Sequence, residues 1–289
     1  VLKDNIQIDG EKWAFTRDNE LVFGKNYFYT KNLYIQSGKK EIGLFPMGRT
    51  GIVLDVISFN GDLINLLLRD PKFRFDGELS GQFRLNHIFK KEGFSGDLTL
   101  EPFIVNGDDH GILLVSAEGK DFKSQINTNV QIFRPGGKIE ANGWVDLREN
   151  ADPQKIFFFD IGVFTFPMVV LDYLVPNGIS NTVGFFSGQL SFFGGKGALQ
   201  LLGELVLEKA KTTIDFIGTR YGFDNQRIVF RKDMIDFTGA EIRDSLGNVA
   251  KVTGGLRHTQ MKDFKLDARI QSDEFILLNT KKAENADYY

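Results

Sequence analysis

The residue types that most often bind metals or act as nucleophiles are sparse in this sequence of 289 residues. There is no cysteine, and the three histidines are His87, His110 and His258. None of them has a second ligand type at the i, i+4 spacing of a helical metal site. The lack of cysteine excludes thiolate ligands, thiol catalysis and disulfides together. We therefore expect no metal and no cofactor.

Three short motifs could carry chemistry, and each has a simpler explanation. Asp108-Asp109-His110 offers acid–base and hard-metal groups, but it lies in a glycine-flanked turn, where aspartate is favoured for its backbone hydrogen bonds. The run Gly194-Gly195-Lys196-Gly197 lacks the spacing of a phosphate-binding loop and resembles a hairpin. Ser187 lacks the Gly-x-Ser-x-Gly context of a hydrolase nucleophile. The sequence therefore predicts no catalytic residue and a protein that is not an enzyme.

The charged residues also narrow the function classes. Thirty-five Lys and Arg against 38 Asp and Glu give a net charge of −3, which argues against a nucleic-acid partner. Paired carboxylates of a glycosidase are set by the fold rather than by spacing, so they stay open at this stage. Most carboxylates nevertheless lie at polar positions of alternating segments or in turns, as Asp97, Asp146, Glu204 and Asp267 do. A solvated outer face explains them.

Period-two alternation of apolar and polar residues runs through almost the whole chain and predicts strands with one dry face. The 28 Phe and 31 Gly fit β-structure, and glycine-rich breaks separate the alternating runs. We expect an all-β fold, a long antiparallel sheet curled into a taco-like gutter. The side chains expected on its apolar face are Phe73, Phe75, Leu79, Phe83, Leu85, Leu98, Leu100, Ile126, Val130, Ile132, Ile139, Val145, Phe157, Phe159, Ile161, Phe186, Leu190, Phe192, Leu199, Leu201, Leu205, Leu207, Phe264, Leu266 and Ile270.

An internal repeat connects two parts of the chain. Gly77, Ser80, Gly81 and Gln82 recur 107 residues later as Gly184, Ser187, Gly188 and Gln189. Two short apolar segments, 63–68 and 168–174, fall at equivalent places, and we expect each to be a short helix that caps the gutter. The repeat predicts an N-terminal β segment over 1–51, a first unit over 52–158, and a second unit over 159–289 that continues into a C-terminal β segment, all within one elongated domain.

The alternation does not decide how the sheet closes. Strands of about ten residues are roughly 33 Å long, enough to fold into a U whose walls lie about 10 Å apart. The walls either seal a sandwich or leave an apolar channel, and both fit the pattern. The most apolar stretch, 156–175, is long enough to cross a bilayer, but Asp160, Pro167 and Asp172 predict strand and short helix instead.

Several ordered motifs resemble the TamB family of envelope proteins, relatives of AsmA-like and bridge-like lipid-transfer proteins, in the form found in Bacteroidetes-type bacteria. The opening run 6–13 is similar to the entry strand of a TamB segment. The segments 186–190 and 202–207 are similar to its recurring glycine and alternating-apolar unit. The runs 228–230, 244–248, 253–256 and 264–267 resemble its terminal domain, with His258 at the corresponding place.

The resemblance implies a function in lipid transport and outer-membrane biogenesis. It implies a location in the periplasm of a Gram-negative bacterium, within a longer chain anchored in the inner membrane and touching membranes through parts outside this segment. Its partner would be phospholipid and, in some members, an Omp85-type outer-membrane barrel. Two alternatives remain open: a closed β scaffold that pairs edge strands with such a barrel during protein assembly, and a carbohydrate-active or adhesive β-solenoid.

Overall fold

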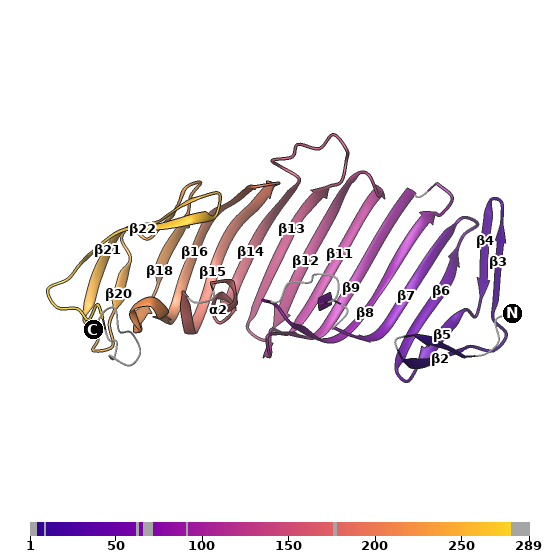
Figure 1. Cartoon of the computed structure of the whole chain (residues 1–289), viewed down its shortest axis with the longest axis horizontal. Coiled ribbons are helices and arrows are strands. Elements are labelled where there is room, and N and C mark those ends of the chain that lie inside the picture. Colours follow the sequence, from indigo (N-terminus) through magenta and orange to yellow (C-terminus); the bar gives the residue numbers. More distant parts are fainter. Residues whose placement is uncertain are drawn as a thin grey trace. The chain divides into compact units, whose positions relative to one another are not determined.

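The computed structural model describes residues 5–8, 10–61, 64–65, 72–90, 92–175 and 178–278. Most of these residues lie in β-strands, and the strands pair antiparallel, which confirms the all-β fold expected from the alternation (Figure 1). The chain divides into two compact units, which are described separately below. Unit 1 comprises residues 1–135 and 142–151, and unit 2 comprises residues 136–141 and 152–289.

Unit 1 is an antiparallel meander with one inserted hairpin. Its paired order is β1, β2, β5, β6, β7, β8, β9, β11, β12, with the short β10 added to β9, while β3 and β4 form a separate two-stranded sheet. The strands are β1 (Asn5–Ile8), β2 (Glu11–Phe15), β3 (Glu20–Gly24), β4 (Tyr27–Lys31), β5 (Tyr34–Ser37), β6 (Lys40–Met47), β7 (Gly51–Asn60), β8 (Phe75–His87), β9 (Glu92–Val105), β10 (Asp108–Asp109), β11 (Ile112–Asp121) and β12 (Gln125–Arg134). Strand β13 (Gly137–Asp146) is divided between the two units.

Unit 2 begins as a meander and then branches. Strand β16 pairs with β15 along most of its length and, on its other edge, with both β17 and β18. Two arms follow from there: β17 pairs with β20 and β18 with β19, and both arms meet β21, which pairs with β22. The strands are β14 (Phe157–Pro167), β15 (Ile179–Gly195), β16 (Ala198–Ile214), β17 (Thr219–Phe223), β18 (Gln226–Phe230), β19 (Met234–Asp236), β20 (Glu241–Arg243), β21 (Val249–Thr259) and β22 (Lys262–Gln271), with the 3-10 turn η1 (Asp215–Ile217).

The helical content is small, as the apolar alternation predicts. The second expected helix is present as α2 (Val170–Leu174), which contacts β15; the Asp172 carboxylate accepts a hydrogen bond from the Thr182 backbone N–H at 3.1 Å. None of the α2 residues is fully buried. Of the first expected helix, Ile64 and Asn65 are helical, and the rest lies outside the described residues. Within the described residues, no helix is both long and apolar enough to cross a membrane.

The two units repeat the same strand register. In unit 1, Gly81 of β8 is paired with Leu98 of β9, and in unit 2 the residues 107 positions later, Gly188 and Leu205, are paired in the same way. The strand before each of these pairs contains a register shift. In unit 1 the shift lies in β7, between residues 56 and 59, and in unit 2 it lies in β14, between residues 163 and 166. The offset read from the sequence therefore describes equivalent positions in three strands of each unit.

Each of these shifts is fixed by the same side-chain hydrogen bond. The irregular residues Ser58 and Thr165 have positive φ values of 59° and 46°. The extra residue of a β-bulge loses its ladder partner, and here a serine hydroxyl supplies one. The backbone N–H of Ser58 donates to Ser80 Oγ at 3.0 Å, and that of Thr165 donates to Ser187 Oγ at 2.9 Å. The repeated serine is thus explained by backbone geometry.

Candidate functional site

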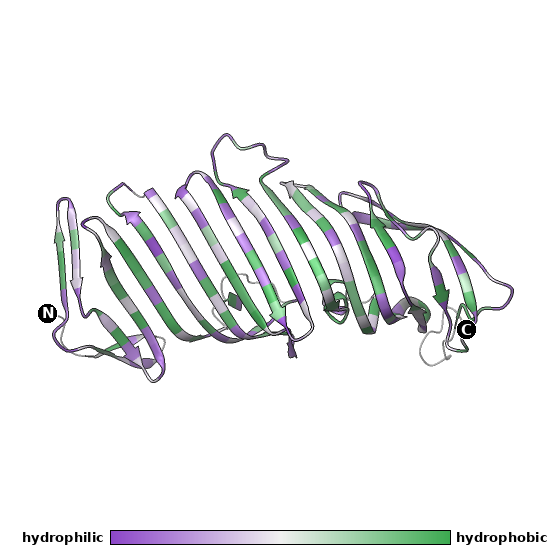
Figure 2. Cartoon of the chain, turned by 180° about the vertical axis from the view of Figure 1, so that it is seen from behind, coloured by the Kyte–Doolittle hydropathy of each residue, from purple (hydrophilic) through white to green (hydrophobic). Residues whose placement is uncertain are grey.

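In unit 1 the apolar side chains gather on one face of the sheet. Directly paired residues in neighbouring strands point to the same face, so the register defines apolar rows that cross β7, β8, β9, β11 and β12. These rows are Ile52–Leu85–Phe94–Gly119–Ile126, Leu54–Phe83–Gly96–Ala117, Val56–Gly81–Leu98–Val115–Val130 and Phe59–Leu79–Leu100–Leu113–Ile132. Figure 2 shows hydrophobic and hydrophilic positions alternating along these strands.

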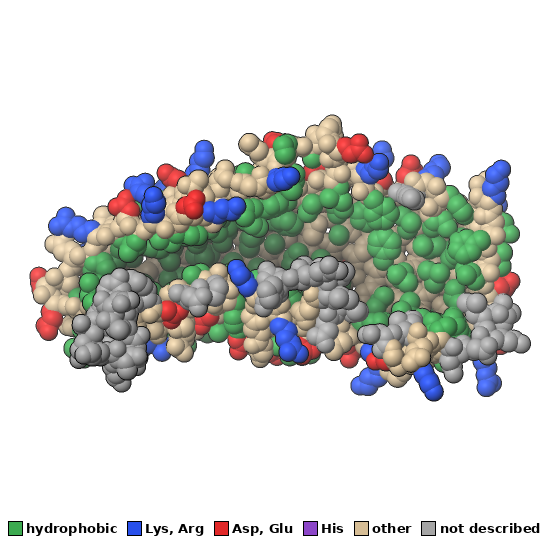
Figure 3. Space-filling model, in the orientation of Figure 1, with side chains coloured by type: hydrophobic (Ala, Val, Ile, Leu, Met, Phe, Trp, Pro, Cys, Tyr) green, Lys and Arg blue, Asp and Glu red, His purple; other side chains and the backbone are tan. Residues whose placement is uncertain are grey.

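Unit 2 has an apolar face built in the same way. Its rows cross β14, β15, β16 and β18 and place the expected side chains next to one another. They are Phe157–Gly194–Leu199, Phe159–Phe192–Leu201, Ile161–Leu190–Gly203–Phe230, Val163–Gly188–Leu205–Ile228 and Phe166–Phe186–Leu207. In the space-filling view of Figure 3, hydrophobic side chains line the hollow of each unit, with polar and charged side chains on the rims. We call this surface of each unit the apolar groove.

The rows of the apolar groove differ in how deeply they are buried, and in unit 2 one end of the strands is buried while the groove is accessible further along. In unit 2, Phe166, Phe186 and Leu207 are 1%, 6% and 5% exposed, whereas Leu190 and Phe192 are half-buried. In unit 1 both end rows are buried, Leu79 and Leu100 at one end and Leu85 and Phe94 at the other, while Phe83 and Leu98 between them are half-buried. An ordinary sealed core would bury the central rows most completely. Both grooves instead keep partly accessible apolar side chains at their centre.

Stacked aromatic rings extend the groove of unit 1. Phe122, in the turn between β11 and β12, is 45% exposed, and its ring lies parallel to that of Phe94 with centroids 4.7 Å apart. Phe83 stacks on both rings at 6.3 Å. Near the other end of β8, Phe75 stacks between Phe73 and Phe103.

The remaining expected groove residues are placed less uniformly. Ile139 and Val145 are half-buried on β13, in unit 2 and unit 1 respectively. Phe264, Leu266 and Ile270 of β22 are 48%, 75% and 44% exposed. On β21, Leu256 is paired with Leu266 and Val252 with Ile270, which gives two apolar pairs, but β22 itself is exposed along its whole length.

Sequence reasoning missed several groove residues on strands β7, β11 and β18. These are Ile52, Leu54, Val56, Leu113, Val115, Ile228 and Phe230. In β7 the cause is plain, since Val53 and Ile57 make the opposite parity apolar as well and hide the alternation. These residues could have been found from their pairing partners. Each of them lies opposite a residue of a neighbouring strand in which apolar and polar residues alternate clearly.

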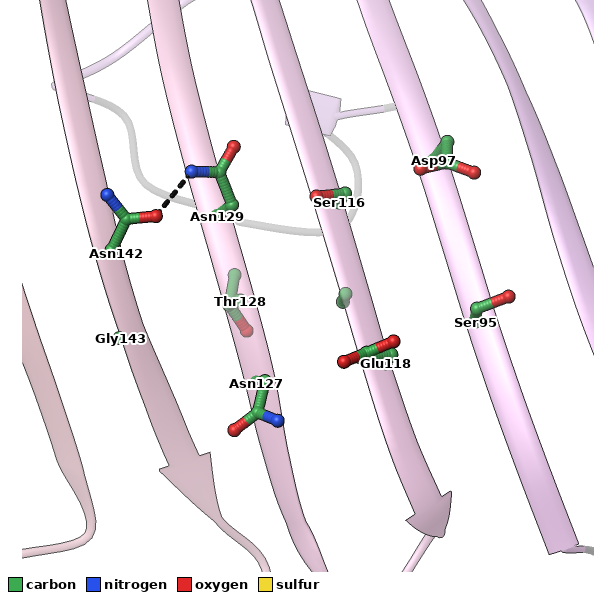
Figure 4. Close-up of a pocket in the computed structure, with 10 residues that line it drawn as sticks. Ser95, Asp97, Ser116, Glu118, Asn127, Thr128, Asn129, Asn142 and Gly143 are labelled. Carbon is green, nitrogen blue, oxygen red and sulfur yellow. Dashed lines mark hydrogen bonds between the residues drawn. The ribbon is translucent and has the colours of Figure 1, made fainter.

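The opposite face of unit 1 is polar across β9, β11, β12 and β13, where Asp97, Glu118, Asn129 and Asn142 lie. A pocket of about 390 Å³ lies on this face and is lined by residues of β9, β11, β12 and β13. Figure 4 shows these residues. Asn129 Nδ2 donates to Asn142 Oδ1 at 2.6 Å, and Asp97 is paired with Arg84 at 2.8 Å. Both interactions link side chains of neighbouring strands on the polar face.

The candidate chemical groups have structural roles in the fold. The Asp109 carboxylate accepts from the Gly111 N–H at 2.7 Å and stabilises the turn after β10. His110 is 1% exposed beside Phe103, and burial holds its pKa below the usual value, against the opposing effect of Asp108. Ser187 Oγ accepts the Thr165 N–H described above.

The rings of the other two histidines, His87 and His258, each contact a neighbouring polar group. His258 is buried with its ring edge against Phe264, and its Nδ1 accepts from the Met261 N–H at 3.3 Å. His87 Nδ1 lies 2.9 Å from Thr50 Oγ1. The described part of the chain contains no group of three or more His, Asp or Glu side chains that could hold a metal ion.

The run 194–197 forms the tight turn between β15 and β16, as its glycines predict.

The apolar groove of each unit is the feature of the geometry on which a function is proposed below. Comparison of the chain with protein-family models, with curated proteins and with solved structures finds no match.

Proposed function

We propose that this chain is a periplasmic segment of a TamB-like lipid-transfer protein, and that it shields phospholipid acyl chains in its apolar grooves without enzymatic chemistry. The observation that carries the proposal is the repeated apolar face, which has the same register in both units and half-buried side chains at its centre. The resemblance to TamB supplies the expected location and substrate.

The energetics fit this role. Each acyl methylene transferred from water to an apolar surface gains about 0.8 kcal/mol, so a phospholipid chain cannot cross water quickly by itself. A surface of repeated Phe, Leu and Ile side chains offers similar contacts at many successive positions. A single specific pocket would instead hold the lipid at one place.

The polar parts of the molecule fit the same role. The strands that line the groove carry Gln82 and Gln189 on their opposite face, each beside the acidic side chain of the next strand. A lipid whose acyl chains contact Phe83 or Leu190 can keep its headgroup at the hydrated rim. The proposal therefore needs no buried partner for the headgroup charge.

Site-specific photo-crosslinking in cells tests the proposal. A photoreactive phenylalanine analogue at Phe83 or Leu190 should capture phospholipid, whereas the same group at Gln82 or Gln189 should not. The four positions form two matched pairs, because each polar control is the immediate neighbour of a groove residue. Equal lipid capture at groove and control positions, or capture at neither, contradicts the proposal.

A second candidate function is a scaffold that assists outer-membrane protein assembly by strand pairing. The full exposure of β22 favours it, since an exposed strand can serve as a template for another chain. In the same experiment, capture of an Omp85-type barrel from positions on β22, without lipid capture at Phe83 and Leu190, would support the scaffold instead.

A further inference from the structure

A second pocket, distinct from the groove rows, lies in unit 2 where β16, β17 and β20 pair. It has a volume of about 720 Å³, within the roughly 300–1,000 Å³ range of small-molecule sites. Four of its lining residues are cationic: Lys209, Lys211, Arg220 and Arg243. All four are exposed, in a chain whose net charge is −3.

The sheet register brings three of these cations around one glycine. Gly222 of β17 is directly paired with Lys211 on one side and with Arg243 on the other, so the three residues share a face. Adjacent strands are about 4.8 Å apart, and Arg220 is two residues along β17 on the same face, at about 7 Å. Three positive side chains therefore surround a position that has no side chain of its own.

The opposite face of these strands is packed, which keeps the backbone of the pocket in place. Tyr221 and Thr212 are paired and are 5% and 6% exposed. The ring of Phe275 stacks on Tyr221 at 5.4 Å, and Tyr221 Oη donates to the Leu277 carbonyl at 2.9 Å. The cationic side chains thus stand on a fixed sheet rather than on a loop.

Within the described residues, none of the four cations takes part in an ion pair. Two carboxylates also line the pocket, Asp224 and Asp244. Asp224 accepts from the Lys209 backbone N–H at 3.1 Å. The two negative charges leave a positive surplus.

Asp244 is 7% exposed, and its two oxygens already accept four hydrogen bonds, all at 2.9 Å. Burial alone would raise the pKa of Asp244, but N–H donors that include Ile276 and Asn248 outweigh it, and the pKa is lowered. This carboxylate organises the turn after β20 and has little capacity left to neutralise an arginine. At the rim of the same pocket, Leu246 is 73% exposed and offers an apolar contact.

We propose that this pocket binds a phosphate ester, with Lys211, Arg220 and Arg243 around the phosphate and Gly222 as its open floor. Guanidinium groups match phosphate oxygens in a bidentate geometry, and an ammonium adds a compact charge. Gly222 is not required by the backbone, because it has no positive φ and an added Cβ would meet its nearest atom at 3.7 Å. Its effect is to leave room for the ligand. This inference is independent of the acyl-chain proposal.

Binding measurements on the full chain test the site with two probes. One is inorganic phosphate, followed by calorimetry, and the other is co-sedimentation with phosphatidylcholine vesicles that contain or lack phosphatidylglycerol. The double variant Lys211→Gln/Arg243→Gln should weaken binding by about tenfold or more, because each of the two substitutions removes a charged hydrogen bond to the phosphate. Gly222→Leu should weaken it similarly by filling the floor. The matched control Lys196→Gln, which removes one charge from the exposed β15–β16 turn, should bind as the unmodified chain does.

The two probes distinguish the source of the phosphate. If the unmodified chain binds inorganic phosphate and the pocket variants do not, the site is open to soluble phosphate esters. If the unmodified chain binds only vesicles with phosphatidylglycerol, and the pocket variants lose this binding, the ligand is a lipid headgroup. The proposal is overturned if the unmodified chain binds neither probe, or if Lys196→Gln weakens binding as much as the pocket variants do. Thermal unfolding of Gly222→Leu verifies that the variant is folded.

Discussion

The equivalent glycines Gly96 and Gly203 should respond in opposite ways to the same substitution. They are 107 residues apart, and they face the groove at the same register, opposite Phe83 and Leu190. At Gly203, φ is +129° and an added Cβ would lie 2.2 Å from the Gln189 carbonyl oxygen. At Gly96, φ is not positive and the nearest atom to an added Cβ is Phe83 Cδ2, at 3.6 Å.

The magnitudes follow from these contacts. Gly203→Ala combines an unfavourable backbone conformation, about 1–3 kcal/mol, with a forced backbone shift of about 1–3 kcal/mol. A loss of that size lowers Tm by roughly 3–10 °C in a protein of this length. Gly96→Ala makes only ordinary contact and restricts the unfolded chain, so we expect a gain of about 0.4–1 kcal/mol.

Thermal and urea unfolding, followed by circular dichroism, measure the difference between the two variants. The comparison is internally controlled, because both variants add one methyl group at the same place in the repeat. The reasoning is refuted if Gly96→Ala loses as much stability as Gly203→Ala, or if Gly203→Ala unfolds like the unmodified chain. Either result would mean that the backbone conformation or the surroundings of Gly96 or Gly203 differ from those described.

Three further predictions concern single side chains. Replacing Phe122 by Ala removes a stacked ring from Phe94, which should cost about 1 kcal/mol and increase binding of a hydrophobic dye to unit 1. Burial lowers the pKa of His110 from its usual 6.5, so below that pH the unfolded chain binds a proton that the folded chain does not. The free energy of unfolding should therefore fall as the pH drops below about 6.5. In urea titrations, His110→Gln should make this dependence on pH weaker. Tyr221→Phe removes the donor to the Leu277 carbonyl, and limited proteolysis should then cleave near residue 277 sooner; unchanged cleavage would contradict the docking described above.

The alternation in the sequence was enough to predict the strands and the shared apolar face where one parity is clearly polar. Strand β8 is an example, with Phe83 on one face and Gln82 and Arg84 on the other. It was not enough where both parities are apolar, as in β7. It also could not distinguish β22 from the groove strands, because an alternating strand looks the same whether or not another part of the protein covers its apolar side.

The cationic pocket could not be predicted from the sequence for a different reason. Its residues are contributed by three strands, and Lys211 and Arg243 are 32 positions apart along the chain. Only the branching of the sheet at β16 places them on either side of Gly222. The spacing of the bulge serines was visible as part of the repeat, but their role in accepting a backbone N–H required the three-dimensional register.

The groove proposal also decides where a blocking charge should be placed. Leu205 is 6% exposed, so Leu205→Arg would place a charge in a packed region and would destabilise the fold. Leu190 is half-buried in the same groove, and an arginine there can extend to the rim while its charge obstructs an acyl chain. The matched control is Gln189→Arg, which adds the same charge on the exposed opposite face.

Native mass spectrometry of the chain purified from cell envelopes tests the central claim most directly. The unmodified chain and the folded Gln189→Arg variant should both retain phospholipid, and the folded Leu190→Arg variant should lose most of it. Absence of lipid from the unmodified chain, or equal lipid on the two arginine variants, would contradict an acyl-chain groove.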